Sequence, residues 1–150
     1  MSLEQNRGVK FYAMGNNEFN NGNYKAALKF FNLSLRHIPN HIPSLNNKGL
    51  ALRHLGKIEK AIKYFDTIIT KDPKYHLAYY NKAVCLACLK KWVEARELFE
   101  KALKIDPFDH LPADGMKTME KNIEIYHKLG DEEYQKEIES NCYAPLRFLF

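Results

Sequence analysis

The sequence predicts an all-α fold, a right-handed superhelix of stacked antiparallel helix pairs, or α-solenoid. Two observations predict it. Pro39, Pro73 and Pro107 recur every 34 residues, and apolar residues between them recur at spacings of three and four, the period of an amphipathic helix. A helix pair of this length cannot bury its apolar face alone, so repeats stack into a continuous core. We therefore expect residues 1–150 to form a single domain of three repeats and a C-terminal cap.

The repeats follow when the recurring proline is placed at position 32, which gives residues 8–41, 42–75 and 76–109. Three further positions hold the same type of residue in every unit. They are a small residue at position 8 (Gly15, Gly49, Ala83), alanine at position 20 (Ala27, Ala61, Ala95) and phenylalanine at position 24 (Phe31, Phe65, Phe99). Small residues allow the two helices of a unit to approach closely, where a larger side chain would overpack.

The ends of the expected helices carry their own signals. Gly22 and Gly56 lie where the two helices of a unit should turn, because glycine adopts a positive φ at little cost. The proline at position 32 ends the second helix, because it cannot donate the next backbone hydrogen bond. Each unit should thus be a helix pair with a short turn inside it and a proline after it.

Residues 110–150 depart from the repeat pattern, as the end of such an array should. Residues 110–129 indicate another first helix, although Lys117 occupies the position of the small residue. Gly130 should then break the chain, and residues 131–140 predict a more polar helix, so that about two capping helices follow the six repeat helices. The apolar segment 143–150 should lie against protein, on the last helices or in a groove of its own or of a neighbouring copy, which would allow self-association.

The composition is that of an ordinary globular protein. Hydrophobic residues make up 45% of the chain and charged residues 27%, and no apolar run approaches the roughly 20 residues that cross a bilayer. The N-terminal residues lack the apolar stretch of a secretory signal. Three cysteines, an odd number, favour a reducing compartment over a disulfide scaffold. We therefore expect a cytoplasmic protein.

The residues at positions 8, 20, 24 and 32 resemble the motif of the tetratricopeptide repeat family over residues 8–109. The departures are few: Glu18 at position 11, where an apolar residue is usual, Ser34 in place of alanine at position 27, and Lys48 and Lys82 at the leucine position 7. The resemblance implies a scaffold or adaptor module without a cofactor, in which the first helices of successive repeats line a concave groove that holds a peptide of a partner protein.

Helical geometry places the residues that would line this groove. At about 100° per residue, positions 2, 5, 6, 9, 12 and 13 of each first helix lie opposite the side that faces the second helix. Only one of these positions holds a charged residue, so the groove should be nearly neutral. Asparagines there can pair with a peptide backbone, and tyrosines add contact area. The candidate peptide-binding residues are Tyr12, Asn16, Asn47, Leu50, Arg53, Tyr80 and Asn81.

One branch of the family holds the acidic C-termini of heat-shock chaperones in a carboxylate clamp. By resemblance, its five positions fall on Tyr12, Asn16, Asn47, Leu77 and Asn81. The two asparagines of the clamp are present as Asn16 and Asn47, but all three of its cations are missing. Because charge-assisted hydrogen bonds carry most of the binding of a carboxylate, this sequence disfavours an acidic C-terminus as the groove ligand.

Signatures of other chemistry are weak. Cys85 and Cys88 form a CxxC pair, but they lie in mid-helix, away from the helix N-terminus that activates a redox thiol. No second cysteine or histidine pair completes a zinc site, and neither a phosphate-binding glycine loop nor a nucleophile elbow occurs. We therefore expect no enzyme, no metal and no cofactor.

Two classes of function remain. Protein–protein interaction through the groove is favoured, and an RNA-binding helical-repeat protein is the alternative, because the chain has a net charge of +5 and a pI of about 9.0. An RNA groove should be positive inside, whereas most lysines here belong to turns and second helices on the outer face. Nucleic acid is therefore the less favoured partner.

Overall fold

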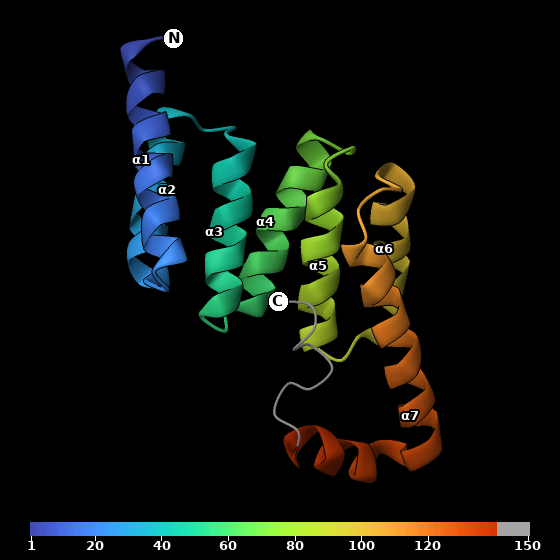
Figure 1. Ribbon diagram of the computed structural model, residues 1–150. Helices are drawn as coiled ribbons and strands as arrows, with labels where there is room; N and C mark the ends of the chain where they lie inside the picture. Colours follow the sequence, from blue (N-terminus) through green and yellow to red (C-terminus); the bar gives the residue numbers. More distant parts are fainter. Residues whose placement is uncertain (141–150) are drawn as a thin grey trace. The chain divides into compact units, whose positions relative to one another are not determined.

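The structure is a computed structural model that describes the backbone of residues 1–140 and the side chains of residues 1–125, 127 and 128. Seven α-helices, and no strand, occur in this part of the chain (Figure 1). They are α1 (Leu3–Asn20), α2 (Tyr24–His37), α3 (Ile42–His54), α4 (Ile58–Lys71), α5 (His76–Cys88), α6 (Trp92–Ile105) and α7 (Leu111–Ser140). Consecutive helices pack as pairs, so the all-α fold class is confirmed.

Each second helix ends two residues before the recurring proline, as predicted. The residue between the helix and the proline is extended, with φ of −134° at Ile38, −138° at Asp72 and −127° at Asp106. Extended backbone is what a residue before proline prefers, because the α conformation would clash with the proline ring. The proline therefore ends the helix both by its missing donor and through its neighbour.

The turn inside each repeat has the same geometry in all three units. Its central residue has a positive φ, 78° at Gly22, 73° at Gly56 and 61° at Lys90. The residue after it donates its N–H to a carbonyl five residues earlier, as from Lys91 to Leu86 at 2.9 Å, which is the Schellman arrangement. Glycine is therefore used where it was predicted, and the third turn places a lysine in a conformation that favours glycine.

The first compact unit, Met1–Pro73, contains α1 to α4. Phe31 and Phe65 are fully buried. A Cβ atom added to Gly15 would lie 2.5 Å from the ring of Phe31, and one added to Gly49 would lie 2.7 Å from the ring of Phe65. The small residue at position 8 is thus required by close approach to the phenylalanine at position 24.

The second compact unit begins at Lys74 and contains α5, α6 and α7. Phe99 and Ala83 are fully buried in its core. The cap helix α7 makes its own close approach to α6 at Gly115, where an added Cβ atom would lie 2.8 Å from the ring of Phe99. The small position of the cap is therefore Gly115 and not the position two residues later, where the repeat register placed Lys117.

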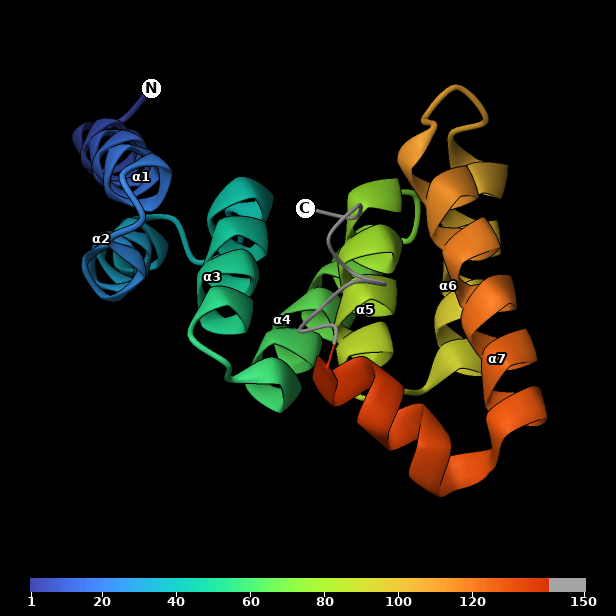
Figure 2. The ribbon, with the colours of Figure 1, turned by 60° about the horizontal axis from the view of Figure 1, so that its bottom comes forward.

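The cap is one helix rather than the expected two. α7 runs without interruption from Leu111 to Ser140, and its second half turns away from its first half (Figure 2). The predicted break at Gly130 is wrong, because a glycine inside a helix costs only about 1 kcal/mol, which good helix formers around it can offset. The apolar segment 143–150, with its expected docking or self-association, lies outside the described residues.

Candidate peptide-binding site

Three asparagines form a hydrogen-bonded chain between α1 and α3 in the first unit. Nδ2 of Asn47 donates to Oδ1 of Asn16 at 2.7 Å, and Nδ2 of Asn46 donates to Oδ1 of Asn47 at 3.1 Å. Asn16 and Asn47 are half-buried. An asparagine side chain carries two donors and two acceptor lone pairs, so this asparagine chain retains capacity beyond the bonds that join it. The structure thus brings together two of the predicted site residues.

Tyr12 lies one turn before Asn16 on α1 and is also half-buried. Its ring meets the ring of His41 edge-on, with 5.0 Å between centroids, and is tilted against Phe31 at 6.2 Å. Tyr12 therefore rests on the core of the first unit, where Phe31 belongs to the buried cluster. Its position is fixed by packing, so it would need little reordering to meet a ligand.

Leu50 and Arg53 follow Asn47 on α3 at intervals of three residues, which places them on one side of the helix. Both are half-buried. The neighbouring His54 is stacked flat on Tyr24, with 4.4 Å between ring centroids. Burial, and then the positive charge of Arg53, lower the pKa of His54. The imidazole is therefore neutral near pH 7, and the positive charge at this end of α3 comes from Arg53.

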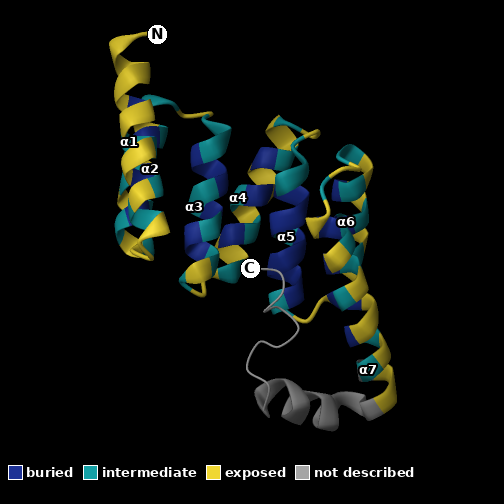
Figure 3. Ribbon diagram, in the orientation of Figure 1, coloured by how far each residue is buried: buried dark blue, intermediate teal, exposed yellow. Residues whose placement is uncertain are grey.

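The predicted site residues of the second unit are more deeply buried than those of the first unit. Tyr80 and Asn81 are each 6% exposed, and Val84 and Ala87, which share their predicted side of α5, are also buried. Figure 3 shows α5 buried along most of its length. Contact of Tyr80 and Asn81 with a peptide stays a prediction, and it would require these side chains to be uncovered first.

The two tyrosines at position 5 do not point fully away from the second helix. Tyr12 lies against Phe31 on α2, and Tyr80 lies against Phe99 on α6, with 5.6 Å between centroids. The helical wheel did not predict these ring contacts with the second helix. A helical wheel treats a side chain as a radial line, whereas a long aromatic side chain leans along the helix and reaches a neighbour.

A buried polar network that the sequence analysis missed joins α2 to α3. The hydroxyl oxygens of Ser34 and Ser44 lie 2.9 Å apart, and both residues are fully buried. Nδ1 of His41 lies 2.7 Å from Oγ of Ser44, and burial lowers the pKa of His41. His41, at one end of this network, is also the residue whose ring meets the ring of Tyr12 edge-on. The network's one signal in the sequence was Ser34 at a position where the repeat motif has alanine.

Other kinds of site find little support in the described residues. No group of three or more histidine, cysteine, aspartate or glutamate side chains there could hold a metal ion. Cys85 is buried and Cys88 half-buried, at the C-terminal end of α5, far from the helix N-terminus that would activate a thiol. None of the helices in residues 1–140 combines the length and apolarity needed to cross a bilayer.

Solved structures show the same fold. The Sgt2 TPR domain from Aspergillus fumigatus is 21% identical, with a TM-score of 0.77 and coverage of 83% of each chain. The second TPR domain of human RPAP3, in complex with an HSP70 peptide, is 20% identical, with a TM-score of 0.72 and coverage of 78% of this chain and 98% of that one. The Yersinia enterocolitica type III secretion chaperone SycD, in complex with a peptide of the translocator YopD, is 16% identical, with a TM-score of 0.69 and coverage of 75% and 91%.

Sequence comparison gives the family directly. No curated protein sequence matches the chain. A family model, described as tetratricopeptide repeat, matches residues 12–76 and again residues 46–110. These two overlapping matches span all three repeats and well over half of the chain. The protein belongs to the tetratricopeptide repeat family.

Proposed function

We propose that this protein is an interaction module that binds an extended peptide segment of a partner protein along α1 and α3. The observation that carries the proposal is the asparagine chain, in which Asn16 and Asn47 hold each other in place at a half-buried surface. Amide groups fixed in this way lose less conformational entropy on binding than mobile ones. They can pair with the N–H and C=O groups of an extended peptide without reading its side chains.

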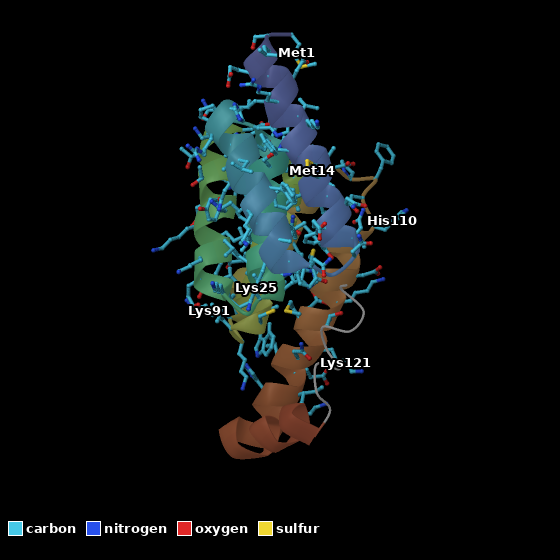
Figure 4. The ribbon with its side chains drawn as sticks, turned by 90° about the vertical axis from the view of Figure 1, so that its left-hand side faces the viewer. Met1, Met14, Lys25, Lys91, His110 and Lys121 are labelled. Carbon is cyan, nitrogen blue, oxygen red and sulfur yellow. The ribbon has the colours of Figure 1, made fainter. Side chains whose placement is uncertain are left out.

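The neighbouring residues complete a surface of suitable chemistry. Val9, Tyr12 and Asn16 follow one another on α1 at spacings of three and four, which places them on one side of the helix. Val9 is 40% exposed, and Figure 4 shows α1 at the surface of this unit, with Met14 labelled. Val9, Tyr12 and Leu50 would supply apolar contact to a peptide. Arg53 would supply one cation for a peptide carbonyl or carboxylate.

The solved structures support a peptide as the ligand, because the similar domains of RPAP3 and SycD are each bound to a peptide. The nature of the peptide should differ from that of a carboxylate-clamp ligand. The clamp's cation positions hold Tyr12, Leu77 and Asn81 in this chain, so no charge-assisted bond is available there to an acidic terminus. We therefore propose an internal segment, held mainly by its backbone and by apolar side chains.

A peptide selected from a random display library against the purified chain would test the proposal. With that peptide, Asn47→Ala should weaken binding by ~1–3 kcal/mol in isothermal titration calorimetry, because backbone groups of the bound peptide lose their partner. Methylating one backbone nitrogen of the peptide at a time should identify the residue that Asn47 contacts. At that residue, the variant and the methylation should not be additive.

The matched control is Asn6→Ala, which removes an exposed amide from the same helix α1 outside the site. It should leave the affinity unchanged. Circular dichroism melts of each variant separate a loss of binding from a loss of fold. If Asn16→Ala and Asn47→Ala both bind the selected peptide as well as the unaltered chain, the peptide uses another surface and the proposal fails.

A further inference from the structure

A pocket of about 490 Å³ lies on the other side of α3, where α2, α3 and α4 form its walls within the first unit. Two consecutive residues of α3 belong to different parts of the unit, Asn47 to the asparagine chain and Lys48 to the pocket. Asn47 is bonded to Asn16 on α1, whereas the ammonium of Lys48 lies over the ring of Tyr64 on α4, 4.4 Å from its centroid. Figure 4 shows Lys25 on α2, the helix that forms one wall of this pocket.

The lining of this pocket is apolar at its base and positive at its edge. Leu28 and Leu52 contribute apolar surface, and the lysines Lys48, Lys60 and Lys63 contribute three ammonium groups. No acidic residue lines the pocket. Within the described part of the chain, no ion pair joins any of the three lysines to a carboxylate. The pocket is thus a concave site with one sign of charge, which concentrates its field on a bound anion.

Lys48 contributes part of the positive charge at the pocket edge. It occupies position 7 of the second repeat, where the motif has leucine, and it is half-buried. A leucine there would fill apolar space, whereas the lysine holds a cation at the pocket edge by a cation–π contact with Tyr64. One of the three positive charges at the pocket edge therefore comes from a departure from the motif.

We propose that this pocket binds an acidic segment of a partner protein, in which one aliphatic or aromatic side chain enters between Leu28 and Leu52 and flanking carboxylates meet Lys48, Lys60 and Lys63. The volume falls within the range of ligand pockets and accommodates one large side chain. A carboxylate near several ammonium groups gains charge-assisted hydrogen bonds that a neutral ligand cannot make. The site is separate from the asparagine chain and does not depend on the function proposed above.

RNA is disfavoured as the ligand by the same contacts. Non-specific binding of single-stranded RNA relies on open aromatic faces on which bases stack, together with a groove of positive charge that follows the backbone. The one aromatic residue in this lining, Tyr64, has a face covered by Lys48. The three lysines surround a single pocket and do not form an extended track.

Fluorescence anisotropy with a labelled hexapeptide, Asp-Glu-Leu-Phe-Asp-Glu, would test the proposal on the full chain. Binding should weaken as salt is raised, since the ion pairs are exposed to solvent. Lys63→Glu should weaken it by roughly fivefold to tenfold, as expected for reversing one exposed charge. Lys48→Leu restores the residue usual in the motif, so it should keep the fold and still weaken binding by roughly fivefold. Lys10→Glu, an exposed residue of α1, changes the net charge equally and should have no effect beyond about twofold.

Two further measurements decide what the pocket recognises. A hexapeptide with both apolar residues replaced by glycine should bind roughly fivefold more weakly, because the apolar base is then unused. Asn32→Trp, an exposed residue at the pocket edge, should block binding while circular dichroism stays unchanged. The proposal is overturned if Lys10→Glu weakens binding as much as Lys63→Glu. It is also overturned if the glycine peptide binds equally well, or if oligouridine binds more tightly than the hexapeptide and loses affinity in Lys63→Glu.

Discussion

The buried hydroxyl pair between α2 and α3 allows a quantitative test of what holds the first unit together. Ser34 and Ser44 are both fully buried, with their oxygens 2.9 Å apart. Replacing Ser34 by alanine, the residue usual at that position of the motif, leaves Ser44 with His41 as its remaining partner. We expect the free energy of unfolding to fall by about 1 kcal/mol, the low end for a buried group that loses one of two partners.

Ser44→Ala should cost more, about 1–2 kcal/mol, because the hydroxyl of Ser34 and Nδ1 of His41 both lose a partner. In the double variant both hydroxyls are absent, so no serine hydroxyl is left in the interior without its hydrogen-bond partner. The double variant should therefore be about as stable as Ser44→Ala, which corresponds to a coupling energy of about 1 kcal/mol between the two serines.

The assay is urea unfolding of the four proteins at neutral pH, followed by circular dichroism, with the slope compared to confirm that the same surface unfolds. Simple additivity of the two losses would show that the hydroxyls do not interact and would refute the reasoning. Single variants as stable as the unaltered chain would refute it equally, since a buried hydroxyl cannot lose its partner without cost unless the interior rearranges.

Three other expectations follow from the core, one turn and two histidines. Ala61 is fully buried, so Ala61→Leu should overpack α3 against α4 and lower stability by ~1–3 kcal/mol in a thermal melt, and an unchanged melt would contradict that packing. Lys90 has a φ of 61°, so Lys90→Gly should raise the urea midpoint, by up to about 1 kcal/mol of stability. Burial lowers the pKa of His41 and His54 below 6.5. Their contribution to stability is full above that value and is lost as the pH falls toward the lowered pKa values, so the urea midpoint should drop as the pH is taken below about 6.5, and a constant midpoint would contradict this.

The repeat architecture was predictable because it depends on residue types that a backbone conformation or a close approach requires. A proline that ends a helix acts through its own ring and through its neighbour, which is extended at Ile38 and Asp72. A glycine under a phenylalanine ring is required by distance, as at Gly49. These constraints are local or recur at a fixed spacing, so one sequence reveals them without any knowledge of the tertiary structure.

Most of the features that the sequence analysis missed depend on contacts between residues far apart in the sequence, and one depends on the balance of preferences along a helix. The hydrogen bond from Asn47 to Asn16, which lie on different helices, was not predicted. Gly130 was expected to break the cap, yet a continuous helix passes through it, because a single unfavourable residue is outweighed by the rest of a helix. The depth of Tyr80 and Asn81 likewise depends on what packs around α5, which periodicity along one helix does not report.

Three residues that depart from the repeat motif make contacts that distinguish this chain from the motif. Ser34 replaces an alanine and is matched by Ser44, so its polarity is satisfied inside the protein. Glu18 replaces an apolar residue and accepts a hydrogen bond from the side chain of Asn23 at 2.8 Å, across the first turn. Lys48 differs from both, because its contact is with a ring and its charge meets no carboxylate in the described residues. The ring of Tyr64 stabilises this cation but does not neutralise it, so an anionic group of a ligand could still pair with it, and this is why we propose an acidic segment for the pocket that α2, α3 and α4 form.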